Sequence, residues 1–212
     1  MQAHRFWDRI ANKYYQQPVP SEADYQRKLT LMREHFNADS EVVEFGCGTG
    51  TTAVTQAPFV KRLRAVDISE RMLAIAHQQA ADAHVNNVEF TRGTLFDLNL
   101  ADNSVDVVMG MSILHLLPNR EETLVEVHRI LKPGGQFISS TACVGEKMAW
   151  IRYLAPIGQK LGLLPVLKVF TMDALRQDLR TAGFYLDQDW VPDSSPMVLF
   201  SVATKTGSPP AG

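Results

Sequence analysis

A cluster of three glycines directly follows a short β-prone run near the start of the chain. The run Glu41–Phe45 leads into Gly46-Cys47-Gly48-Thr49-Gly50, and residues 51–57 can begin a helix that Pro58 bounds. Glycine lets the backbone turn sharply and lets a ligand come close, because it carries no Cβ. The following helix would aim its N-terminal N–H groups at that ligand. The pattern therefore predicts a strand–turn–helix that binds a small molecule.

Strand-like and helix-like segments alternate along the rest of the chain. The expected strands after the turn are 62–66, 87–92, 105–109, 136–141, 185–191 and 197–204, with helices at 69–83, 121–131 and 171–183. Such alternation favours a parallel sheet covered on both faces. No helix separates the last two strands, so we expect them to form an antiparallel hairpin. The sequence predicts an α/β, Rossmann-like, seven-stranded and mostly parallel sheet with helices on both faces and an antiparallel C-terminal edge hairpin.

The length of 212 residues suits one domain with a substantial core. We expect an N-terminal helical segment over residues 1–40, a main domain over 41–205 and a disordered tail over 206–212. The apolar stretch 143–170 predicts a cap or lid insertion within the main domain. Charges and prolines interrupt this stretch, so we expect no transmembrane segment. Peripheral contact with a membrane surface, or use of the stretch as a dimer face, stays open.

Composition narrows the possible partners and compartment. The formal net charge of −2 and pI near 6.3 give no electrostatic footprint for nucleic acid, so none is expected as a partner. Cys47 and Cys143 lie in neither a metal-type cluster nor a CxxC pair, which predicts a reducing compartment and no metal site. The first residues lack the apolar core of a signal peptide. We therefore expect a cytoplasmic protein, either monomer or homodimer.

Two of the site types that use such a glycine turn fit poorly. A P-loop ends in Gly-Lys-Ser/Thr, whereas Gly50 is followed by Thr51-Thr52 with no lysine. A dinucleotide fold has GxGxxG, whereas here Thr51 stands where the third glycine would be. The first type is excluded. The second, as a nicotinamide-dependent oxidoreductase, is disfavoured and remains an alternative.

The turn resembles the first motif of class I S-adenosylmethionine-dependent methyltransferases, in which an acid precedes GxGxG. Later segments resemble successive landmarks of the small-molecule members: Asp67–Ser69, Asn103–Val108, Leu114–Leu117, Arg129–Gly135 and Thr171–Phe184. The resemblance covers roughly residues 41–204. It implies S-adenosyl-L-methionine as cofactor and methyl transfer to a small molecule, and the apolar cap suits an apolar or amphipathic acceptor. A non-catalytic module that binds S-adenosylmethionine is the other alternative.

The resemblance also implies a set of cofactor-binding residues. Asp67 would accept the ribose hydroxyls, Glu44 would orient the turn and approach the methionine ammonium, and Tyr14 would contact the methionine carboxylate from a helix that closes over the cofactor. The full expected set is Tyr14, Glu44, Gly46, Cys47, Gly48, Gly50, Asp67, Ile68, Met72, Thr94, Leu95, Gly110 and Met111. For Met72, packing in the core is an equally good explanation.

Two positions leave the chemistry open. After the third strand the family commonly has Gly-Asp, whose aspartate reaches the adenine amino group, but this chain reads Gly93-Thr94-Leu95-Phe96-Asp97. Either Thr94 takes that place with less hydrogen-bonding power, or Asp97 serves from further along. His115, just after the fourth strand, is a candidate general base because an unperturbed imidazole titrates near neutrality. A packing role for His115 is the alternative.

Overall fold

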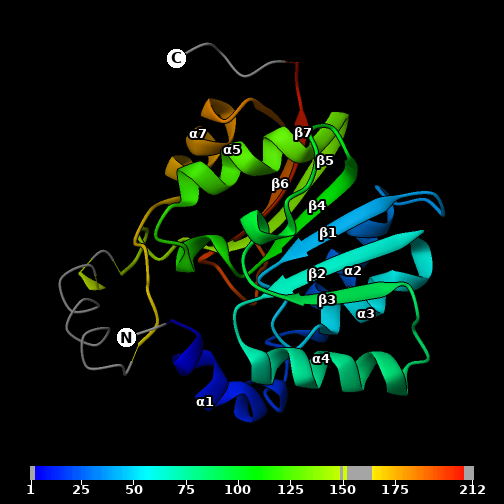
Figure 1. Cartoon of the computed structure of the whole chain (residues 1–212). Coiled ribbons are helices and arrows are strands. Elements are labelled where there is room, and N and C mark those ends of the chain that lie inside the picture. Colours follow the sequence, from blue (N-terminus) through cyan, green and yellow to red (C-terminus); the bar gives the residue numbers. More distant parts are fainter. Residues whose placement is uncertain (1–2, 149, 152–163, 208–212) are drawn as a thin grey trace.

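Seven strands form one sheet in the order β3-β2-β1-β4-β5-β7-β6 (Figure 1). The computed structural model describes residues 3–148, 150–151 and 164–207. The strands are β1 Glu41–Phe45, β2 Arg62–Asp67, β3 Val88–Arg92, β4 Val105–Met111, β5 Leu131–Ala142, β6 Phe184–Trp190 and β7 Val198–Lys205. Strands β1 to β5 pair in parallel, and β7 is antiparallel to both β5 and β6. The predicted Rossmann-like sheet with its antiparallel C-terminal hairpin is confirmed.

Helices cover both faces of this sheet (Figure 1). The α-helices are α1 Ala3–Tyr15, α2 Glu22–Arg33, α3 Thr51–Gln56, α4 Glu70–Asp82, α5 Arg120–Ile130 and α7 Met172–Thr181, and the short 3-10 helices are η1 Ala57–Phe59, η2 Leu95–Leu98 and η3 Leu114–Leu116. Helices α5 and α7 bury Leu124 and Leu175 in one apolar cluster. Helices α2 and α4 bury Met32 and Leu73 in a second cluster on the other face. Helix α1 lies beside α4 (Figure 1).

Local hydrogen bonds fix the helix boundaries that the sequence predicts. Ser69 Oγ accepts the Met72 N–H at 3.1 Å at the start of α4, and Thr171 Oγ1 accepts the Ala174 N–H at 3.1 Å at the start of α7. After α7, Gly183 takes a φ of +89°, a left-handed conformation that favours glycine and ends the helix. These caps set the direction in which each helix enters or leaves the sheet.

The turn expected at residues 132–135 lies inside a strand. Val105 pairs with Leu131 and Val107 with Gln136, so residues 132–135 bulge opposite a single residue of β4. Gly134 takes a φ of +75° within this bulge. The turn chemistry is therefore present, but strand pairing begins before it because Leu131 already pairs with β4.

Thr206 lies at the start of the expected tail. It donates from its N–H and its hydroxyl to the Gly183 carbonyl, at 3.2 and 2.7 Å. Residues 208–212 lie outside the described part of the chain. Residues 149 and 152–163 of the expected cap also lie outside it. No helix of the described residues is long and apolar enough to cross a membrane.

Candidate functional site

The glycine turn between β1 and α3 takes left-handed backbone conformations at all three glycines, with φ of +65° at Gly46, +54° at Gly48 and +76° at Gly50. The N–H of Gly46 donates to the Val66 carbonyl at 2.7 Å, which ties the turn to β2. A Cβ on Gly46 would lie 2.5 Å from Cγ1 of Ile113, so packing requires a glycine there. The turn that the sequence predicts is therefore held rigidly against its neighbours.

The other two glycines differ in what surrounds them. A Cβ on Gly50 would lie 2.6 Å from the Ala76 Cβ, so this glycine lets α3 approach α4. At Gly48 the nearest atom to such a Cβ is Cε1 of Tyr14 at 3.9 Å, which is ordinary contact distance. The space beside Gly48 is therefore available to a ligand.

Asp67, the last residue of β2, connects the glycine turn to the start of α4. Its Oδ2 accepts the Gly48 N–H at 2.9 Å, and its Oδ1 accepts the Ser69 N–H at 2.8 Å. Burial raises the pKa of Asp67 above its usual value. Each carboxylate oxygen keeps a further lone pair, so Asp67 can accept hydroxyl groups of a ligand beside the turn.

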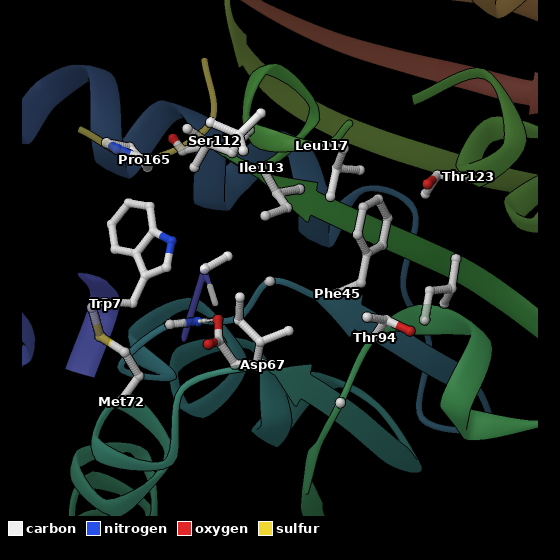
Figure 2. Close-up of a pocket in the computed structure, with 18 of the residues that line it drawn as sticks. Trp7, Phe45, Asp67, Met72, Thr94, Ser112, Ile113, Leu117, Thr123 and Pro165 are labelled. Carbon is white, nitrogen blue, oxygen red and sulfur yellow. Dashed lines mark hydrogen bonds between the residues drawn. The ribbon is translucent and has the colours of Figure 1, made fainter. Parts of the chain in front are cut away.

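A cavity of about 350 Å³ opens at the carboxyl ends of β1 to β4. Figure 2 shows Trp7 and Met72 at one end, Phe45 and Thr94 toward the other, and Asp67 between them. Nine of the residues expected at a cofactor site lie in its wall: Tyr14, Gly46, Gly48, Asp67, Ile68, Met72, Thr94, Leu95 and Met111. The structure thus brings together residues that are spread over about a hundred positions of the chain.

Four expected cofactor residues lie outside this wall, and each has a position that explains why. Gly50 packs against α4, as described above. A Cβ on Gly110 would lie 2.9 Å from Cζ of Phe45, so Gly110 makes room for that ring. Cys47 is buried, and burial raises the pKa of its thiol well above the usual value. Gly110 and Cys47 are therefore packed next to the cavity wall and do not line the cavity.

Glu44 is the fourth of these residues and is unusual for a carboxylic acid. Its side chain is 1% exposed, and its Oε2 has no hydrogen-bond partner in the described part of the protein. Burial, together with the neighbouring charge of Asp67, raises the pKa of Glu44 to about 8. The turn therefore rests on an acid that is largely protonated at neutral pH.

His115, the candidate base, lies in η3 and not in the cavity wall. Its Nδ1 is buried without a hydrogen-bond partner among the described residues, and burial lowers the pKa of the ring to about 4. Its carbonyl accepts the Lys168 N–H at 2.8 Å. The structure does not bring this imidazole to the cavity, so its catalytic role stays a prediction.

Thr94 and Asp97 lie at the start of η2 and bond to each other. Oδ2 of Asp97 accepts from both the N–H and the hydroxyl of Thr94, each at 2.7 Å. The hydroxyl bond and then the N–H bond lower the pKa of Asp97 below its usual value. Thr94 is in the cavity wall and Asp97 is not. The two residues that the sequence offered as alternative ligand contacts are thus hydrogen-bonded to each other.

Helix α1 contributes one side of the cavity through Trp7 and Tyr14. Asp8 fixes this helix to the start of α4, because its Oδ1 accepts the Ser69 hydroxyl at 2.6 Å and the Arg71 N–H at 3.2 Å. The negative charge of Asp8 also lies at the favourable, positive end of the α4 dipole.

Sequence reasoning missed most of the apolar wall. Phe45, Ile113, Leu116, Leu117, Thr123, Pro165 and Val166 line the cavity, as does Ser112, which has a left-handed φ of +56°. Residues 112–117 could have been expected in the wall, because they directly follow the fourth strand at the same sheet edge as the glycine turn.

A family described as methyltransferase domain matches residues 43–139, which include the glycine turn, Asp67 and the strand that precedes Ser112. Over this range the chain resembles the class I S-adenosylmethionine-dependent methyltransferases. The chain is 29% identical to the demethylmenaquinone methyltransferase of Oceanobacillus iheyensis, over 76% of this chain and 72% of that protein. It is 28% identical to a Listeria monocytogenes protein of the same name, over 62% of this chain and 60% of that protein.

The fold of the chain also matches solved structures. A putative methyltransferase of Haloferax volcanii, solved in complex with the activator Trm112, matches with a TM-score of 0.74 and 18% identity. The match covers 98% of this chain and 99% of that one. At 18% identity, this match shows a shared fold and nothing further.

Among the described residues, no cluster of His, Cys, Asp and Glu could hold a metal ion.

Proposed function

We propose that the protein binds S-adenosyl-L-methionine in the cavity and transfers its methyl group to a small, apolar or amphipathic molecule. One observation carries this proposal. Asp67 is the only charged side chain among the described residues of the cavity wall, and it lies beside Gly48, where the absent side chain leaves room for a ligand. The match of residues 43–139 to a methyltransferase domain family supports the same conclusion.

The residues fit the cofactor at three points. Asp67 offers free lone pairs to the two ribose hydroxyls. The Oε2 of Glu44 is buried without a partner among the described residues, and an ammonium group bound near it would lower the pKa of this acid and favour its ionised form. The cavity volume of about 350 Å³ lies within the usual range for ligand pockets, about 300–1,000 Å³.

The contribution of this chain would be to hold two reactants in line and to exclude water. The bound cofactor supplies a methyl group already activated by its sulfonium. Asp67 would orient the ribose, and the turn would fix the amino-acid end. Residues 1–40 would close over the cofactor, with Trp7 and Tyr14 in the wall. A base is needed only for an acceptor that must lose a proton during attack, and that role of His115 remains a hypothesis.

The proposed class of methyl acceptor follows from the other residues of the cavity wall. Trp7, Pro165 and Val166 make the outer part of the cavity apolar, and no Lys or Arg of the described residues lines it for an acidic acceptor. The curated relatives are named for demethylmenaquinone, a quinone, which supports an acceptor of this chemistry. We propose a quinol or another small aromatic or amphipathic molecule.

Turnover distinguishes this proposal from a non-catalytic binding module. Purified protein is incubated with S-adenosylmethionine labelled in the methyl group and with a panel of naphthoquinols, and label is counted in the organic extract. We expect transfer by the wild type and at least a tenfold loss in Asp67→Ala. Binding of the cofactor with no transfer to any acceptor would favour the binding module. Binding of NAD in place of the sulfur nucleotides would favour the oxidoreductase.

A further inference from the structure

Ser112 has a backbone conformation that residues with a side chain rarely adopt. It is the first residue after β4, it takes a φ of +56°, and its N–H donates to the Ser140 carbonyl of β5 at 2.7 Å. A left-handed conformation costs a non-glycine residue free energy, and such positions cluster at functional sites. Of the non-glycine residues that the described chain holds at a left-handed φ, Ser112 is the one in the cavity wall.

The order of the strands places Ser112 on the acceptor side of the proposed cofactor, and the inference below rests on the proposed function. Strand β1 lies between β2 and β4 in the sheet. The ribose would lie at Asp67, which ends β2, and the amino-acid end would lie at the glycine turn after β1. The carboxyl end of β4 is the next position along the sheet, where a methyl acceptor would lie. Figure 2 shows Ser112 across the cavity from Asp67, near Trp7 and Pro165.

Two polar groups at this end of the cavity are available to a ligand. The hydroxyl of Ser112 and the indole N–H of Trp7 have no hydrogen-bond partner among the described residues, and both residues line the cavity. Other hydroxyl groups of the wall are engaged, because Thr94 donates to Asp97 at 2.7 Å and Thr123 donates to a backbone carbonyl at 3.1 Å. The outer end therefore differs from the rest of the wall in offering unused hydrogen-bonding capacity.

The ring of Trp7 is fixed by its neighbours. It makes edge-to-face contacts with Phe6 and Tyr14, with ring centroids 5.1 and 6.3 Å apart. Figure 2 shows its nitrogen directed into the cavity. The direction of the N–H is therefore set before a ligand binds.

The two groups differ in what they can bond. An indole N–H only donates, whereas a serine hydroxyl both donates and accepts. An atom bound between them must therefore accept a hydrogen bond from Trp7. The oxygen of a hydroxyl or carbonyl group has lone pairs for this bond. The lone pair of an aromatic amino group is delocalised into its ring, so an amine could donate to Ser112 but would leave the Trp7 N–H unsatisfied, which costs affinity.

We propose that Ser112 and Trp7 bind an oxygen atom of the methyl acceptor and select a ring that carries a hydroxyl or carbonyl group over one that carries an amino group. Ser112 binds either group, and Trp7 is the specificity-determining residue. Pro165 and Val166, which complete the outer wall, are apolar and suit the ring itself. A phenol or quinol has both features.

The test compares 1-naphthol with 1-aminonaphthalene by titration calorimetry at neutral pH, on the full chain saturated with S-adenosylhomocysteine. The two probes share one ring system, and both are uncharged at this pH. We expect the wild type to bind 1-naphthol about tenfold more tightly than 1-aminonaphthalene, because only the hydroxyl satisfies the indole N–H.

Trp7→Phe removes the N–H and should reduce the preference to within about twofold. The loss of ring area affects both probes alike, so the ratio of the two affinities reports the N–H. Trp150→Phe is the matched control, because Trp150 is exposed and lies outside the cavity wall, and it should keep the full preference.

Substitutions of Ser112 separate its hydroxyl from its backbone. Ser112→Ala should weaken both probes by about tenfold and keep the preference, because both probes bond to the hydroxyl. Glycine adopts a φ of +56° without strain. Ser112→Gly should therefore unfold at a higher urea concentration than Ser112→Ala, yet bind both probes as weakly.

Failure of this inference is distinct from failure of the proposed function. Equal affinities of the wild type for the two probes, or no affinity for either, would overturn the inference. A preference that persists in folded Trp7→Phe would also overturn it, as would unaltered binding in both Ser112 variants. Thermal melts identify any variant that fails to fold. Failure of the folded wild type to bind S-adenosylhomocysteine would overturn the proposed function, and this inference with it.

Discussion

Oδ2 of Asp67 accepts the backbone N–H of Gly48 across a distance of 2.9 Å, joining the end of β2 to the turn after β1. The same carboxylate that would bind a ribose therefore also holds the backbone beside which the rest of the cofactor would lie. Because one side chain serves both purposes, the position of the ligand and the conformation of the turn are coupled.

Gly48→Ala should weaken cofactor binding more than it weakens the fold. Gly48 has a φ of +54°, so a Cβ costs about 1–2 kcal/mol of strain, and that Cβ would occupy the space left for the ligand. We expect at least tenfold weaker binding of S-adenosylhomocysteine by calorimetry. Gly134→Ala is the matched control, because Gly134 has a φ of +75° and no atom within 4 Å of an added Cβ. It should lose similar stability in urea unfolding and no affinity; an equal loss of affinity in both variants contradicts the account.

Glu44→Gln should remove a pH dependence of stability. Burial raises the pKa of Glu44 from 4.5 to about 8, so between those values the unfolded chain has released a proton that the folded chain retains. Stability therefore falls as pH rises through this window, by up to about 5 kcal/mol. The variant should gain stability relative to the wild type between pH 5 and 8. Chemical unfolding at several pH values measures this, with the exposed Glu34→Gln as control. A difference independent of pH would show that Glu44 is ionised in the folded state.

His115→Leu should have the opposite pH dependence. Burial lowers the pKa of His115 from 6.5 to about 4, so the unfolded chain binds a proton in this window that the folded chain does not. The stability of the wild type is lost as pH falls through it, by about 2 kcal/mol after allowance for partial exposure. The variant should lose less stability between pH 7 and 4. The exposed His84→Asn is the control, and an equal acid sensitivity of His115→Leu and the wild type would contradict the burial.

Asp8→Ala should loosen α1 from the body of the protein. Asp8 accepts the Ser69 hydroxyl and the Arg71 N–H, and α1 carries Trp7 and Tyr14 into the cavity wall. Loss of these bonds costs about 1–2 kcal/mol locally, so we expect faster proteolysis within residues 3–20 and several-fold weaker binding of S-adenosylhomocysteine. Lys13→Ala changes an exposed charge on the same helix and should change neither. Unaltered proteolysis in Asp8→Ala would show that α1 is held by other contacts.

The sequence predicts the sheet and its helices well because their signals are local. The caps Ser69 and Thr171 act within three residues, and the alternation of β-prone and helical segments needs no tertiary contact. The bulge at residues 132–135 was missed because it depends on the pairing of Leu131 with Val105 in another strand. The contact of Thr206 with Gly183 has no local signal for the same reason, since Gly183 lies in the turn after α7, far from Thr206 in the sequence.

The sequence predicts the cavity residues that belong to the glycine-turn motif better than those that depend on packing between distant segments. Asp67 and Gly48 belong to the local strand-turn-helix pattern, and they meet in the structure. Gly110, which was expected in the wall, instead makes room for Phe45, because the contact depends on the packing of two strands. The bond between Thr94 and Asp97 was open in the sequence, since either side chain could have faced the cavity.

Titration calorimetry of the full chain with S-adenosylmethionine, S-adenosylhomocysteine and NAD would decide which nucleotide the cavity binds. We expect both sulfur nucleotides to bind, NAD not to bind, and Asp67→Ala to lose at least tenfold in affinity, a loss that the exposed control Asp39→Ala does not show. Binding of NAD with no binding of either sulfur nucleotide would contradict that expectation.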